Sequence, residues 1–262
     1  MVNFMGLVLN ENMKIYRRAR TWVMVGLLLL LNAFISVIVK LSAVTEPSMW
    51  SVFRWEAVFG FMLITVFTSI VAASSVADEF SSGTIKLLLI RPWTRAKILL
   101  SKYISVILFA LLLVVLLFAF TYLLNLILFG YDNPLASQMG TMYGGTTAGY
   151  FVQYYFYEFI TLVVTATLAF MLSSVFRSSA LAIGISLFII LIVNSFLSLL
   201  AFLDYAWIDY LLFVHLDLVQ YLDQAPIREG MTLGFSLSVL GAYYAVFMAL
   251  SWYVFQKRDV AA

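Results

Sequence analysis

Long apolar runs separated by short polar stretches set the pattern of this chain. A helix needs about 20 mostly apolar residues to cross a bilayer. Six runs meet this requirement, near residues 21–41, 56–76, 103–129, 150–175, 179–200 and 235–255. Lipid offers backbone groups no hydrogen-bond partner, so each run is expected to be helical. All four prolines lie between these runs, which predicts spans that proline does not break. The pattern therefore predicts an all-α, polytopic membrane protein whose residues 1–262 form a single transmembrane domain.

A shorter amphipathic pattern precedes the first run. Residues 3–19 place apolar side chains such as Phe4 and Val8 on one side of a helix and Lys14 and Arg17 on the other. This pattern is typical of an interfacial helix that lies in the membrane plane, with its basic face toward anionic lipid. Two roles stay open for it. It either anchors the chain to lipid alone or also contacts a cytosolic partner.

Composition narrows the class of protein. The chain is 64% hydrophobic and 11% charged, with a mean hydropathy of +1.04, which excludes an ordinary soluble domain. It has no cysteine, which excludes disulfides, thiolate metal sites and a cysteine nucleophile. His215 is the single histidine, and we expect it on the outer surface without a specific role. An intramembrane enzyme is therefore disfavoured, and no catalytic, cofactor-binding or metal-binding residue is predicted in this chain.

The basic residues predict the orientation, because cytosolic loops are rich in lysine and arginine. With both termini in the cytosol, only Lys40, Arg54 and Arg228 of the 15 lysines and arginines fall outside. On that outer side, residues 204–230 alternate acidic residues with apolar pieces too short to cross the membrane. They are expected to form a re-entrant or interfacial helical segment before the last span.

The most charged stretch is the predicted cytosolic loop at residues 78–102, DEFSSGTIKLLLIRPWTRAKILLSK. Gly83 offers a backbone break, and Thr84 can cap a short helix that follows it. Pro92 disfavours helical geometry in the residue before it and should end that helix, after which Thr94 can cap the next one. The loop thus predicts a short amphipathic helix across the cytosolic ends of two spans. It is either an ordinary basic loop bound to lipid head groups or a contact for a soluble partner.

This loop resembles the one between the second and third helices of ABC-2-type permeases, the membrane subunits of one class of ATP-binding-cassette (ABC) exporter. The family pattern is a glutamate, Gly-Thr, an apolar stretch, Arg-Pro or Lys-Pro, and Arg-x-x-(I/L)-(L/V)-x-x-K. The matching positions are Glu79, Gly83, Thr84, Leu87–Ile90, Arg91, Pro92, Arg95, Ile98, Leu99 and Lys102. Residues 172–187 also resemble the family's turn between helices four and five.

The resemblance implies a coupling helix that docks on a separate cytosolic ABC ATPase. The residues it assigns to this contact are Glu79, Gly83, Thr84, Lys86, Leu87, Arg91, Pro92 and Arg95. Family members work as two permeases with two ATPases, so a second permease subunit is expected, in a homodimer or a heterodimer. The sequence contains no G-x-x-x-x-G-K-[ST] phosphate loop, so ATP and magnesium are expected to bind the partner ATPase.

The same resemblance implies what the complex does. It implies export across the cell membrane, with lipid as the surroundings and no nucleic-acid partner. The cargo it allows ranges over peptide antibiotics, other drugs and lipid-linked molecules, and so includes a role in antibiotic resistance. The chain itself is expected to have no enzymatic activity.

Polar residues inside the predicted spans are candidates for an intramembrane site, above all Glu158 and Asn194. A charge at the bilayer centre costs roughly 2.5–3.5 kcal/mol on insertion scales, so such residues are often functional. Tyrosines around Glu158 resemble an interfacial aromatic belt, which would instead place it near the head groups. Contact with substrate or protons is the other interpretation. Asn32, Asn125 and Asn194 are expected to hydrogen-bond between helices.

The rival class is an ion-driven secondary transporter. That class often uses discontinuous helices and repeated halves. Here the spans lack proline, and the basic loop after the second span has no counterpart after the fifth. Whether transport requires an ATPase distinguishes the two classes.

Overall fold

The fold is an all-helical bundle. The computed structural model describes residues 4–42, 47–84, 93–131, 147–193, 205–223, 226, 228 and 230–257. Within them every regular element is a helix, which confirms the all-α prediction. Five helices are long and apolar enough to cross a membrane: α2 (Ala19–Ser42), α3 (Met49–Ser81), α5 (Arg95–Phe129), α7 (Thr147–Val175) and α10 (Leu233–Lys257). The chain is thus a multi-pass membrane protein, and five of the six predicted runs are long helices.

The remaining predicted run, 179–200, is described only in part. It begins as α8 (Ser179–Leu187) and continues as the π-helical turn η1 (Phe188–Val193). The helical geometry therefore changes at Phe188 although no proline is present. Later residues of this run, including Asn194, lie outside the described residues. A sixth span accordingly stays a prediction.

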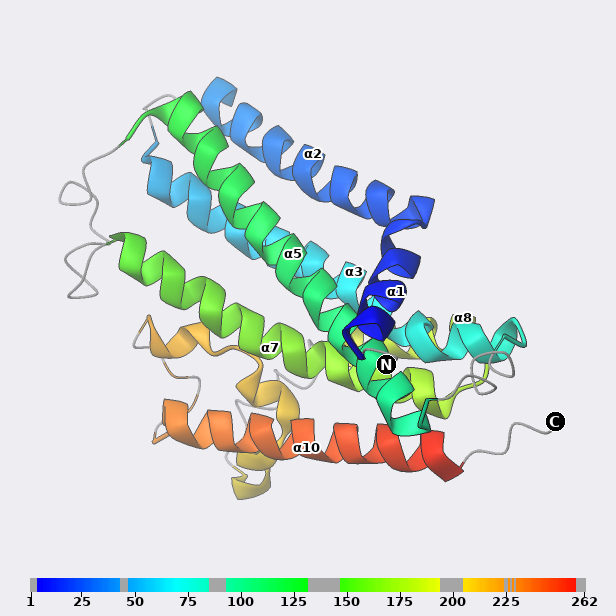
Figure 1. The fold of residues 1–262 in the computed structure, drawn as a ribbon. Helices are drawn as coiled ribbons and strands as arrows, with labels where there is room; N and C mark the ends of the chain where they lie inside the picture. Colours follow the sequence, from blue (N-terminus) through cyan, green and yellow to red (C-terminus); the bar gives the residue numbers. More distant parts are fainter. Residues whose placement is uncertain are drawn as a thin grey trace.

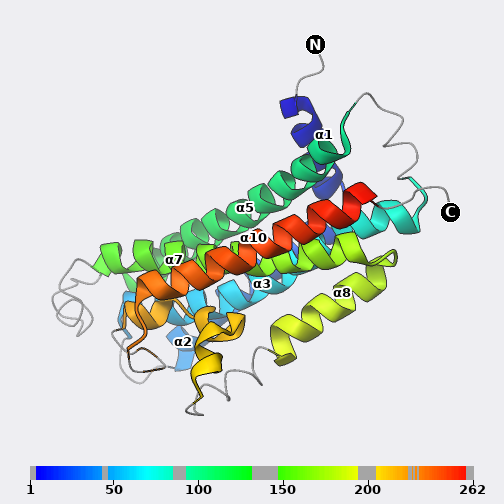
Figure 2. The same ribbon diagram turned by 90° about the horizontal axis from the view of Figure 1, so that it is seen from below.

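Helix α3 lies at the centre of the bundle. It packs against α2, α5, α7 and α8, while α10 packs along α7 (Figures 1 and 2). In the most apolar 18-residue stretch of each helix, 61% of the residues are buried in α3 and in α7, but only 22% in α2 and 17% in α10. These two inner helices and α5 therefore supply most of the core. The outer two present apolar side chains that suit lipid or another helix.

Close packing fixes α3 against its neighbours. A Cβ atom at Gly60 would lie 2.4 Å from Cδ2 of Leu117, so glycine lets α3 and α5 approach this closely. Farther along α3, the ring of Trp50 stacks on Phe151 of α7 at 5.4 Å, and Phe53 meets the same ring edge-on at 4.7 Å. These contacts hold α3 between α5 and α7 at several levels.

A buried carboxylate joins three helices at the half of the bundle remote from the N-terminal helix α1 (Phe4–Tyr16). Glu56 of α3 accepts hydrogen bonds from Ser36 of α2 and from the side-chain amide of Asn125 of α5. Asn125 thus makes the expected bond between helices. Asn32 differs, because its Nδ2 donates to the carbonyl of Leu28 in its own helix at 2.7 Å. The sequence analysis did not single out Glu56, since its two partners come from other spans.

Before α10 the chain forms short 3-10 helices. Residues 205–223 of the segment predicted over 204–230 contain η2 (Ala206–Tyr210), η3 (Leu212–His215) and η4 (Val219–Tyr221). Of these, η3 packs against α10. Whether this segment is re-entrant or interfacial stays a prediction.

His215 is buried, so the expectation of a surface histidine is wrong. Its Nε2 lies 2.8 Å from the carbonyl oxygen of Asp209 and its Nδ1 lies 2.7 Å from Oγ of Ser236. A carbonyl only accepts, so Nε2–H donates to Asp209 and Nδ1 accepts from the Ser236 hydroxyl. The packing of η3 on α10 produces this burial, which a sequence with one isolated histidine does not reveal.

The histidine predicts a pH-dependent stability. Burial lowers the pKa of His215, although its bond to Asp209 opposes the shift. The stabilising contribution is therefore complete above the unfolded pKa of about 6.5 and is lost as the pH falls toward the lower folded pKa. Thermal unfolding in detergent should show the melting temperature falling as the buffer is acidified below neutrality. His215→Gln, whose amide donates and accepts without titrating in this range, should flatten that dependence; an unchanged pH profile would contradict the account.

Candidate functional site

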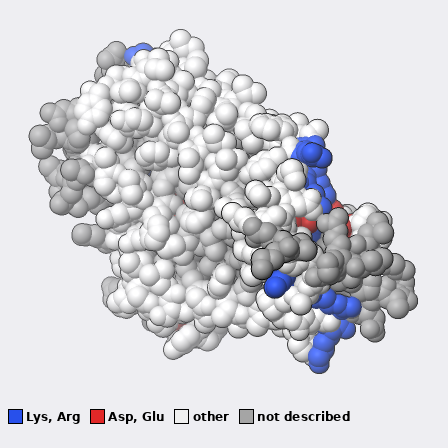
Figure 3. All heavy atoms as spheres, in the orientation of Figure 1, with Lys and Arg blue, Asp and Glu red and all other residues white. Residues whose placement is uncertain are grey.

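Charged side chains gather at one end of the bundle, where α1 (Phe4–Tyr16), the end of α3 and the start of α5 meet. Figure 3 shows lysine and arginine grouped there on the visible face, while the middle of that face is free of charge. The end of α10 belongs to the same region, because Arg95 Nη1 donates to the carbonyl oxygen of Gln256 at 2.9 Å. This end therefore carries the predicted coupling loop.

Local sequence signals shape both ends of that loop. α3 ends at Ser81, and Gly83 follows in the left-handed region with φ +72°, as a backbone break requires. α5 begins at Arg95, and the side chain of Thr94 accepts a hydrogen bond from the backbone N–H of Lys97 at 3.4 Å. The predictions for Gly83 and Thr94 are thus confirmed.

The middle of the loop is not described. Residues 85–92 lie outside the described residues, so Lys86, Leu87, Arg91 and Pro92 stay predictions, as does the helix expected there. Thr84, expected as the cap of that helix, donates its hydroxyl to the Glu79 carboxylate. Thr84 is therefore bonded to the last turn of α3.

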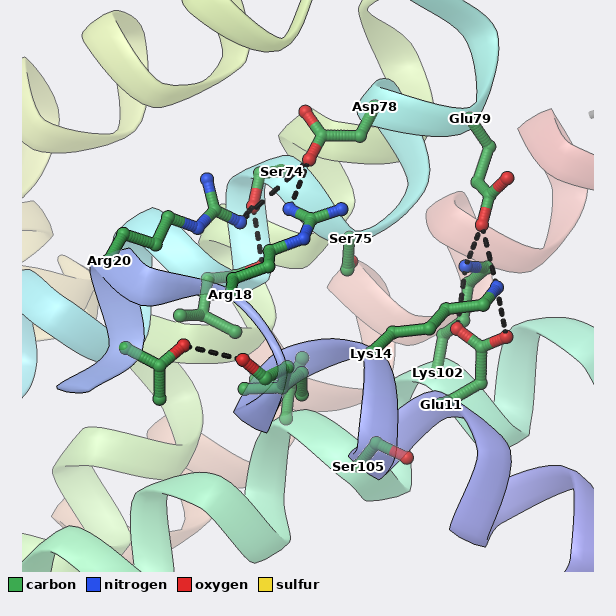
Figure 4. Close-up of a pocket in the computed structure, with 14 residues that line it drawn as sticks. Glu11, Lys14, Arg18, Arg20, Ser74, Ser75, Asp78, Glu79, Lys102 and Ser105 are labelled. Carbon is green, nitrogen blue, oxygen red and sulfur yellow. Dashed lines mark hydrogen bonds and ion pairs between the residues drawn. The ribbon is translucent and has the colours of Figure 1, made fainter. Parts of the chain in front are cut away.

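Four alternating charges bring the two ends of the loop together, and we call them the charge node: Glu11, Lys14, Glu79 and Lys102. Lys102 Nζ lies 2.8 Å from Oε2 of Glu11 and 2.9 Å from Oε1 of Glu79. Lys14 Nζ lies 2.7 Å from Oε1 of Glu11 and 3.0 Å from Oε1 of Glu79 (Figure 4). Each ammonium thus bridges the same two carboxylates. The node links α1, α3 and α5.

Lys102 is the most buried member, with 3% of its side chain exposed. An unpaired ammonium in such a place would carry a large desolvation penalty, which its two carboxylate partners offset. Lys14 is more exposed. Burial by itself lowers the pKa of Lys14, but hydrogen bonds and charge attraction from Glu11 and Glu79 outweigh it and raise the pKa. These two carboxylates therefore favour the charged form of Lys14.

A second, more exposed group lies beside the node. Arg18 Nη1 contacts Oδ2 of Asp78 at 2.6 Å, and Arg20 Nη2 donates to Oγ of Ser74 at 2.8 Å (Figure 4). Exposed pairs of this kind contribute roughly 0–1 kcal/mol. The crevice between these side chains has a volume of about 40 Å³, which suits a water molecule rather than a ligand. The site therefore connects helices rather than binding a small molecule.

The N-terminal helix turns an acidic side chain into the bundle, and its expected orientation in the membrane plane stays a prediction. α1 covers residues 4–16 of the predicted 3–19 and packs on α5 and α2. Leu7, Val8 and Glu11 are buried, whereas Met5 and Leu9 of the predicted apolar face are exposed. Glu11 turns inward because Lys102 supplies its counter-charge. The sequence analysis missed Glu11, whose partner is 91 positions away.

The intramembrane candidate Glu158 lies elsewhere, and Asn194 is outside the described residues. Glu158 of α7 lines a separate cavity with Thr161 and Thr165, and it is not part of the charge node. The structure therefore does not join the two sets of predicted site residues.

Neutralising Lys102 should destabilise the fold. Lys102→Met leaves Glu11 and Glu79 facing each other with one remaining ammonium, so the free energy of unfolding should fall by about 3–5 kcal/mol. Arg18→Ala, a matched loss of one positive charge from an exposed pair, should cost about 1 kcal/mol or less. Thermal melting of the purified variants compares the two. Equal losses would contradict the special role of the buried lysine.

Comparison with known proteins places the chain among membrane proteins without an assigned activity. A family model described as "Protein of unknown function (DUF2705)" matches residues 23–261. "Uncharacterized protein YhcI" of Bacillus subtilis (strain 168) is 35% identical, over 98% of this chain and 99% of that protein. "Uncharacterized membrane protein YdbK" of the same organism is 28% identical, over 95% and 99%. The chain thus belongs to the DUF2705 family.

Proposed function

We propose that this chain is the permease subunit of an ABC exporter of the ABC-2 type, driven by a separate ATPase. The observation that carries the proposal is the charge node, which ties both ends of the motif-bearing loop to α1. A loop that only covered the membrane surface would not need a buried ion pair between the end of α3, which precedes it, and the first part of α5, which follows it. Glu79 and Lys102, both positions of the family pattern, contact each other at 2.9 Å.

The orientation follows from the distribution of charge. Lys14, Arg18, Arg95 and Lys102 all lie at the end that carries the loop. Under the positive-inside rule this end faces the cytosol of a cell-membrane protein, together with both termini. In this scheme α8 and η1 begin the fifth of six spans.

Force would enter through residues 85–92. A movement of the docked ATPase acts on α3 through Gly83 and on α5 through Thr94. Because the charge node bonds α3, α5 and α1 to one another, these helices would tilt together instead of separating. Docking itself would rest mainly on shape and apolar contact, since exposed ion pairs add about 1 kcal/mol or less each.

Two permeases and two ATPases would form the complete exporter, with ATP and magnesium bound by the ATPase subunits. The lipid-exposed apolar faces of α2 and α10 leave room for a second permease, either identical or related. The path for the cargo would open between the permeases.

A secondary transporter is the second candidate, and Glu158 is the observation that favours it. Intramembrane carboxylates often carry protons or coupling ions in such transporters. The motif-bearing loop has no role in that mechanism, so the ATP-driven function is supported better.

Site-specific cross-linking tests the proposal. The chain has no cysteine, so Ser82→Cys at the exposed end of α3 and Val152→Cys on the exposed face near the start of α7 give single-thiol variants. Each is co-expressed with an ABC ATPase of the same organism and treated with a bifunctional thiol–amine reagent. The Ser82 variant should cross-link to the ATPase and the Val152 variant should not. Glu79→Gln should lower ATP-driven transport by the purified complex while leaving membrane insertion unchanged.

Three results would contradict this function. One is ATP hydrolysis by the chain purified alone. Another is cross-linking from position 152 in preference to position 82. The third is transport in proteoliposomes that contain the chain without any ATPase.

A further inference from the structure

A cavity of about 260 Å³ opens between α3 and α7, below η1. We propose that it binds the positively charged group of a small amphipathic organic cation. Its walls combine Glu158 with threonine, aromatic and aliphatic side chains, among them Phe61, Met62, Tyr154 and Leu191. We call it the α3–α7 cavity. It lies away from the charge node, and none of the residues that the structure describes lines both.

The partly buried carboxylate of Glu158 differs from those of Glu56 and Glu79. Glu56 accepts bonds from Ser36 and Asn125, and Glu79 accepts bonds from two lysines and Thr84. For the side chain of Glu158, the described residues supply neither a hydrogen-bond donor nor an ion-pair partner. Asp217 lies near enough for its charge to act on Glu158, which adds negative potential. A carboxylate without a partner in an apolar span is costly, so the site favours an incoming cation.

The other polar groups of the cavity also favour a positively charged ligand. The Thr161 hydroxyl donates to the carbonyl of Glu158 at 2.9 Å, and the Thr165 hydroxyl donates to the carbonyl of Thr161 at 3.0 Å. Their protons are therefore engaged, and their oxygens can only accept from a ligand. Among the described residues, no lysine or arginine lines the cavity. An anionic head group would find no counter-charge there, whereas an ammonium or pyridinium would.

The remaining lining determines the shape and class of the ligand. The rings of Phe61 and Tyr154 lie 6.2 Å apart, and aromatic faces attract organic cations. The volume is slightly below the range of about 300–1,000 Å³ typical of drug-sized ligands. The cavity therefore suits a cation of one or two rings, or the head of a longer molecule whose tail extends into lipid. It is too small for a folded peptide.

This binding preference does not depend on what drives transport. As a statement about exported cargo, it rests on the proposed function. In that case it narrows the cargo to amphipathic cations.

Binding to the isolated full-length chain tests the inference. The protein is placed in nanodiscs of zwitterionic lipid, and fluorescence reports binding of the cation 4-(4-dimethylaminostyryl)-N-methylpyridinium. The control ligand is its uncharged parent, 4-(4-dimethylaminostyryl)pyridine, at a pH above its titration. The cation should bind saturably and more tightly than the parent. Glu158→Gln should weaken cation binding by about tenfold or more without changing binding of the parent, because it removes the charge and keeps the size.

Two further variants keep the test decisive. Asp78→Asn removes a carboxylate at the far end of α3 and should leave binding unchanged. Thr161→Val removes one acceptor and should weaken cation binding, which also serves if Glu158→Gln fails to fold. Equal affinity for the two ligands, or full cation affinity in a folded Glu158→Gln or Thr161→Val protein, would overturn the inference. No ATPase is present, so a negative result here is separate from failure to couple to an ATPase.

Discussion

A charged lysine removed from water is the constraint on which the loop-bearing end of this molecule depends. Lys102 can occupy its buried position only if carboxylates surround its ammonium, and these come from two other helices, Glu11 of α1 and Glu79 of α3. That requirement explains why α1 turns an acidic residue inward and why α3 ends next to the start of α5. It also explains why the two helix ends that flank the loop are held close to each other. One buried charge thus determines the mutual position of three helices.

The central helix connects the features that matter for function. α3 carries Glu79 of the charge node at one end, Phe61 and Thr65 of the α3–α7 cavity farther along, and Glu56 beyond them. With a rise of about 1.5 Å per residue, the node and the cavity lie roughly 20 Å apart along this helix. A tilt imposed at the loop would therefore change the cavity wall directly, since the same rigid element forms part of both. In the proposed exporter, this continuity would couple the ATPase to the cargo.

Local sequence patterns predict most of the helices, but they predict the charge node only in part. Apolar runs predict the five long helices, and Gly83 and Thr94 mark the helix end and start because backbone breaks and caps are local signals. The roles of Glu11, Glu56 and His215 were missed. Each depends on a partner from a distant part of the chain, and burial arises only when helices pack. The amphipathic pattern of α1 also does not reveal that Glu11 faces the bundle, because this burial depends on an ion pair with α5.

The central claim is that the charge node holds the two ends of the loop in one arrangement, and a distance distribution measures this directly. Nitroxide labels on Ser82→Cys and Lys97→Cys, both exposed and on either side of the loop, report their separation by pulsed electron spin resonance. With the node intact, a single narrow distribution is expected in lipid nanodiscs. With Lys102→Met added, the distribution should broaden, because the ends of α3 and α5 lose their shared counter-charges. An equally narrow and unshifted distribution in both proteins would contradict the account.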